Sequence, residues 1–530
     1  MPPADPVPGE RSTSVLDLRL VPFAAAAWIG TGVALVAGAT AAAVLAGLAS
    51  VGAAVVVGVS CARSGHRMSA EVPVTAFVLV AAAVFASCFA GTAAVRVHVA
   101  ETGLVAHLAR AGATATVTVV LVDDPKLPAS SSPGRQVMVL ARAISVSTAE
   151  GSHPAGGAVT VFAPAAGWDE LVPGQVVTVR ARLNTSARAG MTVAILRVSG
   201  PPADVAPPPP HQRWAAEVRT RLAAAAADAL PTDAAGLLPG LVVGDTSAQL
   251  PQTRTDFTAS GLAHLTAVSG ANVSILLGAV LLVVRAVGVG PRAGALLAGV
   301  ALVAFVVVAR PSPSVLRAAA MGTVALLALV VGRRKQALPA LAASVIVLLA
   351  VWPSLAVDYG FALSVSATAA LVVIAPVWVQ WLRVRGWPRA PAEILAVSTA
   401  ACVVTAPLVA AMSGTVSLVS VAANVAVAPV VAMVTVVGAV GALVALLHAG
   451  AAAMVLTTAG PPLWWILEVA SRTAGLPSAT VAVPDGLAGA AVTLAVLVLL
   501  VVGWWRRGSP SAVCLTCLAL LTLVRALPPG

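Results

Sequence analysis

Long apolar stretches are the feature that most limits how this chain can fold. Apolar runs of about 20 residues recur from Val21 almost to the C-terminus, interrupted by one polar interval between about residues 97 and 235. About 20 apolar residues in a helix cross the hydrocarbon core of a bilayer. Hydrophobic residues make up 59% of the chain and charged residues 10%, whereas soluble domains carry roughly 25% charged residues. We therefore predict a polytopic α-helical membrane protein.

The apolar runs predict three spans before the polar interval and about ten after it. The block at about 21–60 is long enough for two spans with a turn near Gly38–Thr40, and a third span follows at about 72–95. Pro429 is expected to break the longest of the later segments. The later spans are expected at about 264–284, 292–309, 314–332, 336–353, 359–381, 391–412, 417–447, 449–467, 484–505 and 510–527.

The polar interval has the pattern of a small β domain. It carries short runs such as ATVTVVLV, GAVTVFAP and GQVVTVRARL, in which β-branched residues alternate with others between Pro, Gly and Asp. About five such strands predict a small all-β barrel or sandwich, with an OB-like barrel as one candidate. A Pro-rich linker and an amphipathic helix follow, and this helix is expected either to lie at the membrane interface or to be a short soluble linker.

The expected organisation has five parts. These are a cytoplasmic N-terminal tail, three transmembrane helices, the inserted OB-like domain, the linker with its amphipathic helix, and a second transmembrane domain, at 1–20, 21–96, 97–205, 206–235 and 236–530.

The distribution of Lys and Arg predicts which side of the membrane each loop faces. Arg11 and Arg19 favour a cytoplasmic N-terminus, so three spans would make the inserted β domain extracytoplasmic. Alternate loops of the second half should then be cytoplasmic. The loop near His448 is not basic, but the other four are, at Arg285–Arg292, Arg333–Lys335, Arg383–Arg389 and Arg506–Arg507. This bias also explains much of the net charge of +11.

Polar residues inside the second transmembrane domain mark the first candidate site. Such groups are costly in a bilayer unless they line a water-filled path or pair within the bundle. Between Gly236 and Ile275, glycines interrupt short apolar segments as they do in broken helices. We predict that this region lines a pore, and the alternative is a loop at the membrane surface. Its candidate residues are Asp245, Arg254, Asp256, His264, Ser269, Gly270 and Asn272.

Two later places also break the apolar pattern. Arg310 lies at the expected outer membrane face, where a long side chain can reach water. Arg317 lies about one turn inside the next span, where a cation should pair with an acidic group or face an anion. Asp358 and Ser364 lie at the outer start of another span. Asp358 is expected either to cap that helix or to be the partner of Arg317.

The sequence lacks the motifs of several enzyme classes. It has no Walker A motif, no HExxH and no GxSxG, and its seven His residues form no HxHxD array. All five Cys residues lie outside the β-rich domain, and the CxxC of Cys514 and Cys517 stands in an apolar run without other ligands. We therefore predict a protein that is not an enzyme and that needs no metal and no cofactor.

The sequence resembles the ComEC competence channel family in several motifs. These are GLVVGDTSAQLP, the run SGLAHLTAVSGANVS, PSVLRAAAMG, and then VWPSLAVDYGFALS and TAPLVAAMSGTVSLVS in the family's order. The three N-terminal spans and the β domain are similar to the family's front end. The resemblance implies a channel that imports single-stranded transforming DNA across the bacterial cytoplasmic membrane during natural competence. It places motif positions at Asp245, His264, Ser269, Gly270 and Arg317.

The resemblance also implies partners and reveals two departures. Single-stranded DNA and membrane lipids are the expected partners, with a DNA receptor outside, a cytoplasmic helicase-like motor and a separate nuclease as further ones. Asn272 stands where the family often has a second His, and no metallo-β-lactamase-like domain follows the last span before Gly530. We expect a form that lacks this domain. DNA binding by the β domain stays open, because Phe162 and Trp168 are its only aromatic residues for stacking bases.

Two other functions remain open at this point. One is a transporter or flippase for another anionic or amphipathic envelope substrate, such as a lipid-linked glycan. The other is a membrane-bound enzyme that uses His264 with Asp245 or Asp256.

Overall fold

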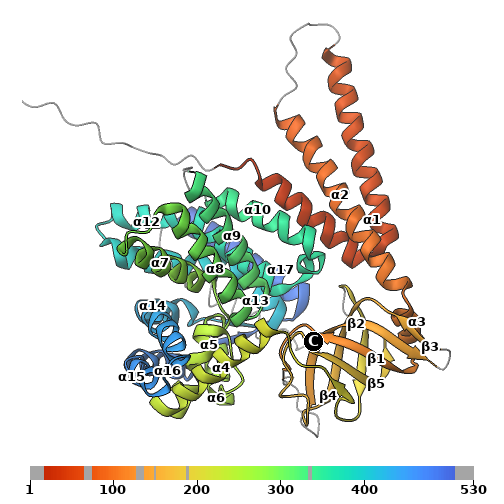
Figure 1. The fold of residues 1–530 in the computed structure, drawn as a ribbon. Helices are drawn as coiled ribbons and strands as arrows, with labels where there is room; N and C mark the ends of the chain where they lie inside the picture. Colours follow the sequence, from red (N-terminus) through yellow and green to blue (C-terminus); the bar gives the residue numbers. More distant parts are fainter. Residues whose placement is uncertain are drawn as a thin grey trace, which may run out of the picture.

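The computed structural model describes residues 17–64, 74–126, 136–148, 151–186, 190–331 and 337–507. It confirms a mostly helical, polytopic membrane protein with one inserted β domain. Figure 1 shows a β-barrel beside a large helical bundle, and a pair of long helices that rises away from both.

The N-terminal unit consists of helices α1 (Val21–Ser64) and α2 (Val74–Thr102), which lie side by side (Figure 1). The helical conformation of α1 is interrupted at Gly38, where φ is 83° and ψ is 169°, which is where the sequence predicts a turn. Only glycine adopts such angles readily. The two helices approach closely at Gly30, where a Cβ would lie 2.4 Å from the carbonyl oxygen of Ala86.

Five strands close into a barrel, which confirms the OB-like domain. They pair in the order β1 (Thr114–Leu121), β2 (Gln136–Thr148), β4 (Ala158–Pro164), β6 (Thr192–Val198) and β5 (Val176–Asn184), and β5 pairs again with β1. Among these pairs only β4–β6 is parallel. This is the Greek-key arrangement of an OB-fold. The short strands β3 (Gly151–Pro154) and β7 (Asp204–Val205) extend β2 and β5.

The barrel interior is filled by alternate residues of each strand. In β5, for example, Val177, Val179 and Leu183 are at most 1% exposed. Helix α3 (Leu104–Arg110) packs its buried side against this same core. Trp168 is fully buried in it, and its Nε1 donates to the carbonyl of Gly200 at 3.1 Å. Trp168 is therefore a core residue and is not available for stacking bases.

The helix after the barrel packs against protein. Its apolar face joins one core formed by α4 (Pro210–Ala229), α5 (Thr232–Val243), α14 (Ser420–Ala445), α15 (Ala449–Thr457) and α16 (Gly460–Ala474). Leu222 is fully buried there, whereas Trp214 is 41% exposed. The helix therefore packs against the bundle, and its expected position at the membrane interface stays a prediction.

The remaining helices surround this core. Helices α7 (Gly270–Ala286), α8 (Pro291–Ala309) and α9 (Pro313–Val331) share an apolar cluster, and α10 (Ala337–Val351) and α11 (Tyr359–Val373) pack with the first part of α1. The other elements are α6 (Pro251–Ala259), η1 (Ala263–Leu265), η2 (Pro353–Val357), α12 (Ala375–Val384), α13 (Arg389–Ser413), β8 (Thr415–Ser417), β9 (Thr480–Ala482) and α17 (Gly486–Arg507).

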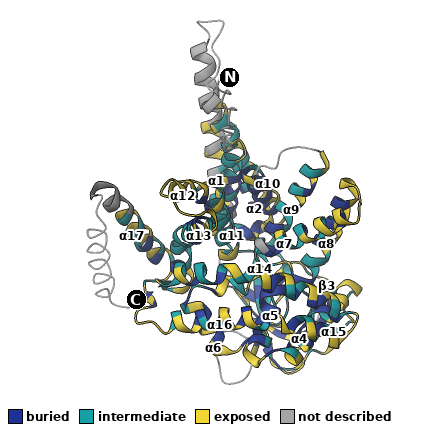
Figure 2. Cartoon of the chain, turned by 90° about the vertical axis from the view of Figure 1, so that its left-hand side faces the viewer, coloured by how far each residue is buried: buried dark blue, intermediate teal, exposed yellow. Residues whose placement is uncertain are grey.

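Apolar residues also cover outward faces of the bundle. On α7 and α8, Leu282, Leu296, Val300 and Val303 are 62–70% exposed, while other residues of these helices are buried (Figure 2). A contiguous apolar exterior of this kind suits contact with lipid chains.

The described residues contain seven helices long and apolar enough to cross a membrane, or eight if one bent pair counts as a single span. That pair is α15 and α16, which meet at 54°, where the sequence predicts one span at about 449–467. Four shorter apolar helices lie at Thr232–Val243, Asn272–Ala286, Ala337–Val351 and Gly486–Leu500. The last expected span, at about 510–527, lies outside the described residues. The total of about thirteen spans stays a prediction.

One expectation about a helix break is wrong. Helix α14 is continuous from Ser420 to Ala445 with Pro429 inside it. Proline is tolerated in membrane helices where neighbouring groups satisfy the disturbed backbone. Nε1 of Trp465 on α16 donates to the carbonyl of Ala426, three residues before Pro429, at 2.9 Å, and this bond joins α16 to α14 next to the proline.

Candidate functional site: buried arginines in the bundle and at the barrel junction

The first site is centred on Arg317 in α9. This residue is 5% exposed. Its Nε donates to Oγ of Ser364 on α11 at 2.7 Å, and its Nη1 contacts Sδ of Met321 at 3.3 Å. Within the described residues no carboxylate lies within ion-pair distance of this guanidinium. Arg317 is thus a buried cation held by neutral groups.

The alternative that pairs Asp358 with Arg317 is wrong. The carboxylate of Asp358 accepts a hydrogen bond from the backbone N–H of Phe361 at 2.7 Å, so it caps the start of α11. Unpaired N–H groups at a helix start attract such a side chain strongly. Ser364, one turn further along α11, is the residue that reaches the arginine.

The start of α7 lies against Arg317. A Cβ on Gly270 would be 3.2 Å from Nη2 of Arg317, so the missing side chain lets the guanidinium approach. Two contacts hold this end of α7: Oγ of Ser269 donates to Oδ1 of Asn272 at 3.2 Å, and Nδ2 of Asn272 donates to the carbonyl of Leu241 at 2.9 Å. The N-terminus of a helix carries partial positive charge. Two sources of positive potential therefore meet here, and no carboxylate in the described part of the chain lies within ion-pair distance of the guanidinium.

The second site joins the barrel to the bundle. Arg310, between α8 and α9, binds Asp124 through two parallel contacts, Nε to Oδ2 at 3.0 Å and Nη2 to Oδ1 at 2.9 Å. Its Nη1 also donates to Oε1 of Gln212 on α4. We expected Arg310 to reach water at the outer face, but it is 6% exposed. The guanidinium of Arg310 is bound by the carboxylate of Asp124 instead of by water.

A second arginine completes this junction. Nη2 of Arg219 on α4 lies 3.4 Å from Oδ2 of Asp124 and 3.4 Å from Oδ2 of Asp245. Its Nη1 donates to the carbonyls of Val243 at 3.1 Å and Val308 at 3.2 Å. Arg219 therefore connects the barrel, α4, the end of α5 and the end of α8.

Sequence reasoning missed three members of this junction, namely Asp124, Gln212 and Arg219. The dipeptide of Asp123 and Asp124 directly after a strand is visible in the sequence, and so is the position of Arg219 on an amphipathic helix. Neither pattern identifies its partners, because Asp124 lies 95 residues from Arg219 and 186 residues from Arg310 in the sequence, and Asp245 belongs to a different segment from Arg219.

Three other predicted residues lie apart from both sites. Arg254 is exposed, and its Nη2 donates to the carbonyl of Thr246 at 3.4 Å, while Asp256 accepts from Gln252 within α6. His264 in η1 has open surface, and its Nδ1 lies 3.1 Å from the carbonyl of Gly261. The surrounding protein lowers the pKa of His264 by desolvation, which outweighs the opposite effect of the Gly261 contact.

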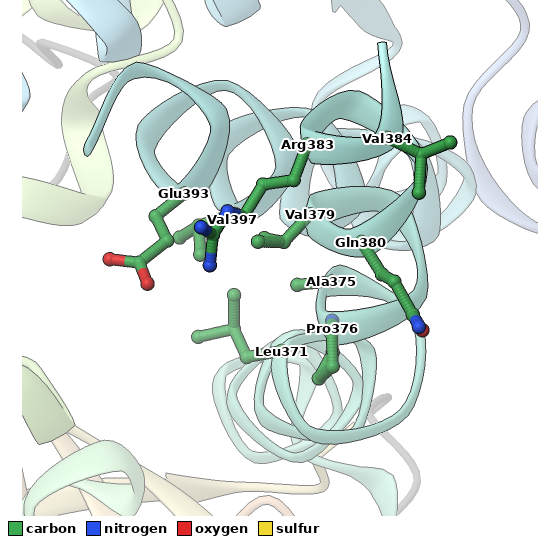
Figure 3. A pocket seen from close by; sticks show the side chains of 9 residues that line it. All are labelled: Leu371, Ala375, Pro376, Val379, Gln380, Arg383, Val384, Glu393 and Val397. Carbon is green, nitrogen blue, oxygen red and sulfur yellow. The ribbon is translucent and has the colours of Figure 1, made fainter. Parts of the chain in front are cut away.

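Two cavities lie apart from Arg317, Arg310 and Arg219. One, of about 640 Å³, lies between α11, α12 and α13, and Figure 3 shows Arg383 and Glu393 among its mainly apolar lining. The other, of about 600 Å³, lies between α6 and α16 and includes Asp256. Within the described residues no group of three or more His, Cys, Asp or Glu side chains could hold a metal ion.

Comparisons with known proteins agree with this architecture. Over 151 residues the chain is 31% identical to ComE operon protein 3 of Bacillus subtilis (strain 168), which is 28% of this chain and 20% of that protein. The chain therefore matches about a fifth of the length of this curated relative. No solved structure matches the chain. Residues 241–508, from the end of α5 through α17, match the model of the family described as competence protein. The chain belongs to this competence protein family.

Proposed function

We propose that this protein is a conduit that imports single-stranded DNA across the bacterial cytoplasmic membrane. Family membership and the relative from a competence operon support a role in DNA uptake. The observation that carries the proposal is the buried Arg317, which faces the start of α7 and lacks a carboxylate partner among the described residues. A buried cation without a counter-ion is costly unless an anion visits it.

DNA has the chemistry that such a site would serve. Each nucleotide brings one phosphate charge, so a strand can pass a fixed cation stepwise. Among the described residues the site consists of one arginine, Ser364, Met321 and a helix start, and a single cation attracts phosphate without binding it so tightly that movement stops. In this proposal the protein is not an enzyme and the barrel is extracytoplasmic. A separate motor protein drives the strand through the membrane, and a separate nuclease degrades the second strand.

Transport by the purified protein tests the proposal. Full-length protein in liposomes should make a labelled single-stranded oligonucleotide resistant to external nuclease, and a duplex of the same length should remain outside. Arg317→Gln should lower the initial rate on the order of tenfold, which is the effect of about 1.4 kcal/mol on a barrier. Arg385→Gln is the matched control, because Arg385 is an exposed arginine stacked on Trp381 in α12.

Two results would contradict the proposal. Equal influx through Arg317→Gln and Arg385→Gln would show that the buried cation is not on the path. Transbilayer movement of a labelled anionic lipid, with no oligonucleotide influx, would favour a flippase instead.

A further inference from the structure

We propose that Arg310 and Arg219 form a binding site for a backbone phosphate of the incoming DNA, and that Asp124 of the barrel occupies this site until DNA arrives. This inference rests on the proposed function, since it names the groups that the strand would meet at the barrel junction. In this role Asp124 competes with the phosphate of the nucleic acid for the two arginines.

The geometry of the Arg310–Asp124 pair is the first argument. Nε and Nη2 of Arg310 point at the two carboxylate oxygens at 3.0 and 2.9 Å. This paired arrangement is also how a guanidinium binds two oxygens of a phosphate. Nη2 of Arg219 adds a third contact to the same carboxylate at 3.4 Å. A phosphodiester carries the same single negative charge as the aspartate and could make the same contacts.

The arginines are held by groups other than Asp124. Arg219 donates to the carbonyls of Val243 and Val308, and Arg310 donates to Gln212. The backbone of Arg310 has φ of 68° and ψ of 148°, an unusual conformation for a residue other than glycine. These contacts would keep both guanidinium groups in place after the carboxylate leaves. Such preorganisation favours an exchange of anions.

The electrostatics of the junction also require an anion. The side chains of Arg310 and Arg219 are 7% and 11% exposed. Without Asp124, Arg219 would keep Asp245 as its ion-pair partner, and Arg310 would have no carboxylate partner among the described residues. Asp124 itself is 26% exposed, so a ligand can approach it from solvent. Arg310 follows the last residue of α8 and lies three residues before the start of α9, whose second turn carries Arg317. A strand held at the junction would therefore be close to the proposed path.

An affinity comparison tests this inference. Full-length protein in detergent is titrated with a fluorescent single-stranded oligonucleotide at low salt. Asp124→Asn should bind on the order of tenfold more tightly than the unmodified protein, because the competing charge is gone. Asp123→Asn removes the same charge one residue away, where the carboxylate contacts Lys126, and should change affinity less than about twofold. Arg310→Gln added to Asp124→Asn should abolish the gain.

Three results would overturn it: equal affinities of the Asp124 and Asp123 variants, a gain that survives Arg310→Gln, or weaker binding by a correctly folded Asp124→Asn. Hydrogen exchange of the unmodified protein gives a test that needs no variant. Saturating oligonucleotide should increase exchange around residues 121–126 if Asp124 is displaced, and unchanged or slower exchange there would count against the inference. Because neither measurement involves transport, both can fail while oligonucleotide influx through liposomes remains normal.

Discussion

At the residue scale, the two arginines that the sequence singled out turn out to have different surroundings. Arg317 is held by a hydroxyl and a thioether, whereas Arg310 is held by a carboxylate and an amide. Only the first lacks a counter-ion among the described residues. Two arginines only seven residues apart therefore have different electrostatic environments, because different segments of the chain contribute their partners.

Gly270 should matter because of what a side chain there would touch. A Cβ would lie 3.2 Å from Nη2 of Arg317, so Gly270→Ala should shift the guanidinium and lower the rate of oligonucleotide influx about two- to tenfold. Gly278→Ala is the matched control on the same helix, since a Cβ there meets nothing within 4 Å. Equal influx through both variants would contradict the role given to the start of α7.

His264 should contribute a pH dependence to stability. Its pKa in the folded protein is lowered by desolvation, below the ordinary value of about 6.5. A lowered folded-state pKa means that protonation favours the unfolded chain. The stability associated with neutral His264 is therefore complete above about pH 6.5 and is lost as the pH falls through the folded-state pKa.

Melting temperatures between about pH 5 and pH 7.5 check this prediction. His264→Gln should flatten the acid side of the curve relative to that of the unmodified protein. An identical acid slope in the unmodified protein and the His264 variant would refute it.

At the scale of elements, periodicity and composition predicted what each segment is but not what it packs against. The alternation of β-branched residues correctly predicted the strands, because a barrel interior demands period two. The amphipathic pattern of α4 correctly predicted a helix, yet its apolar face meets α5, α14 and α15. Asp358 illustrates the same limit, since the sequence left open whether it caps α11 or pairs with Arg317, and the structure shows the cap.

The contact between α1 and α2 gives a stability prediction. Gly30→Ala would place a Cβ 2.4 Å from the carbonyl oxygen of Ala86, so the helices must separate. Overpacking of this kind costs about 1–3 kcal/mol. Gly32→Ala, with nothing within 4 Å of its Cβ, should be neutral or slightly stabilising.

Thermal unfolding in detergent measures this difference between the two variants. A melting temperature for Gly30→Ala equal to that of Gly32→Ala would show that α1 and α2 do not approach closely at Gly30.

At the scale of the whole molecule, the barrel marks one side of the bundle. Arg310 follows the last turn of α8 and binds the barrel loop, so this end of α8 faces the barrel. Helix α8 has 19 residues, which at about 1.5 Å per residue places Arg292, at its other end, nearly a bilayer thickness away. The basic residue Arg292 therefore lies at the end of α8 away from the barrel, and the side of the membrane that each end faces stays a prediction.

This arrangement predicts an extracytoplasmic barrel and a cytoplasmic Arg292. In a variant whose five native cysteines are replaced, single cysteines can be introduced as Ser152→Cys on β3 and Arg292→Cys at the start of α8. A membrane-impermeant maleimide added to intact cells should label position 152 at once. It should label position 292 only after the membrane is permeabilised, because excess Arg on a short loop retains that loop in the cytoplasm. Labelling of position 292 but not 152 in intact cells would invert the topology and place the junction arginines on the exit side of any DNA path.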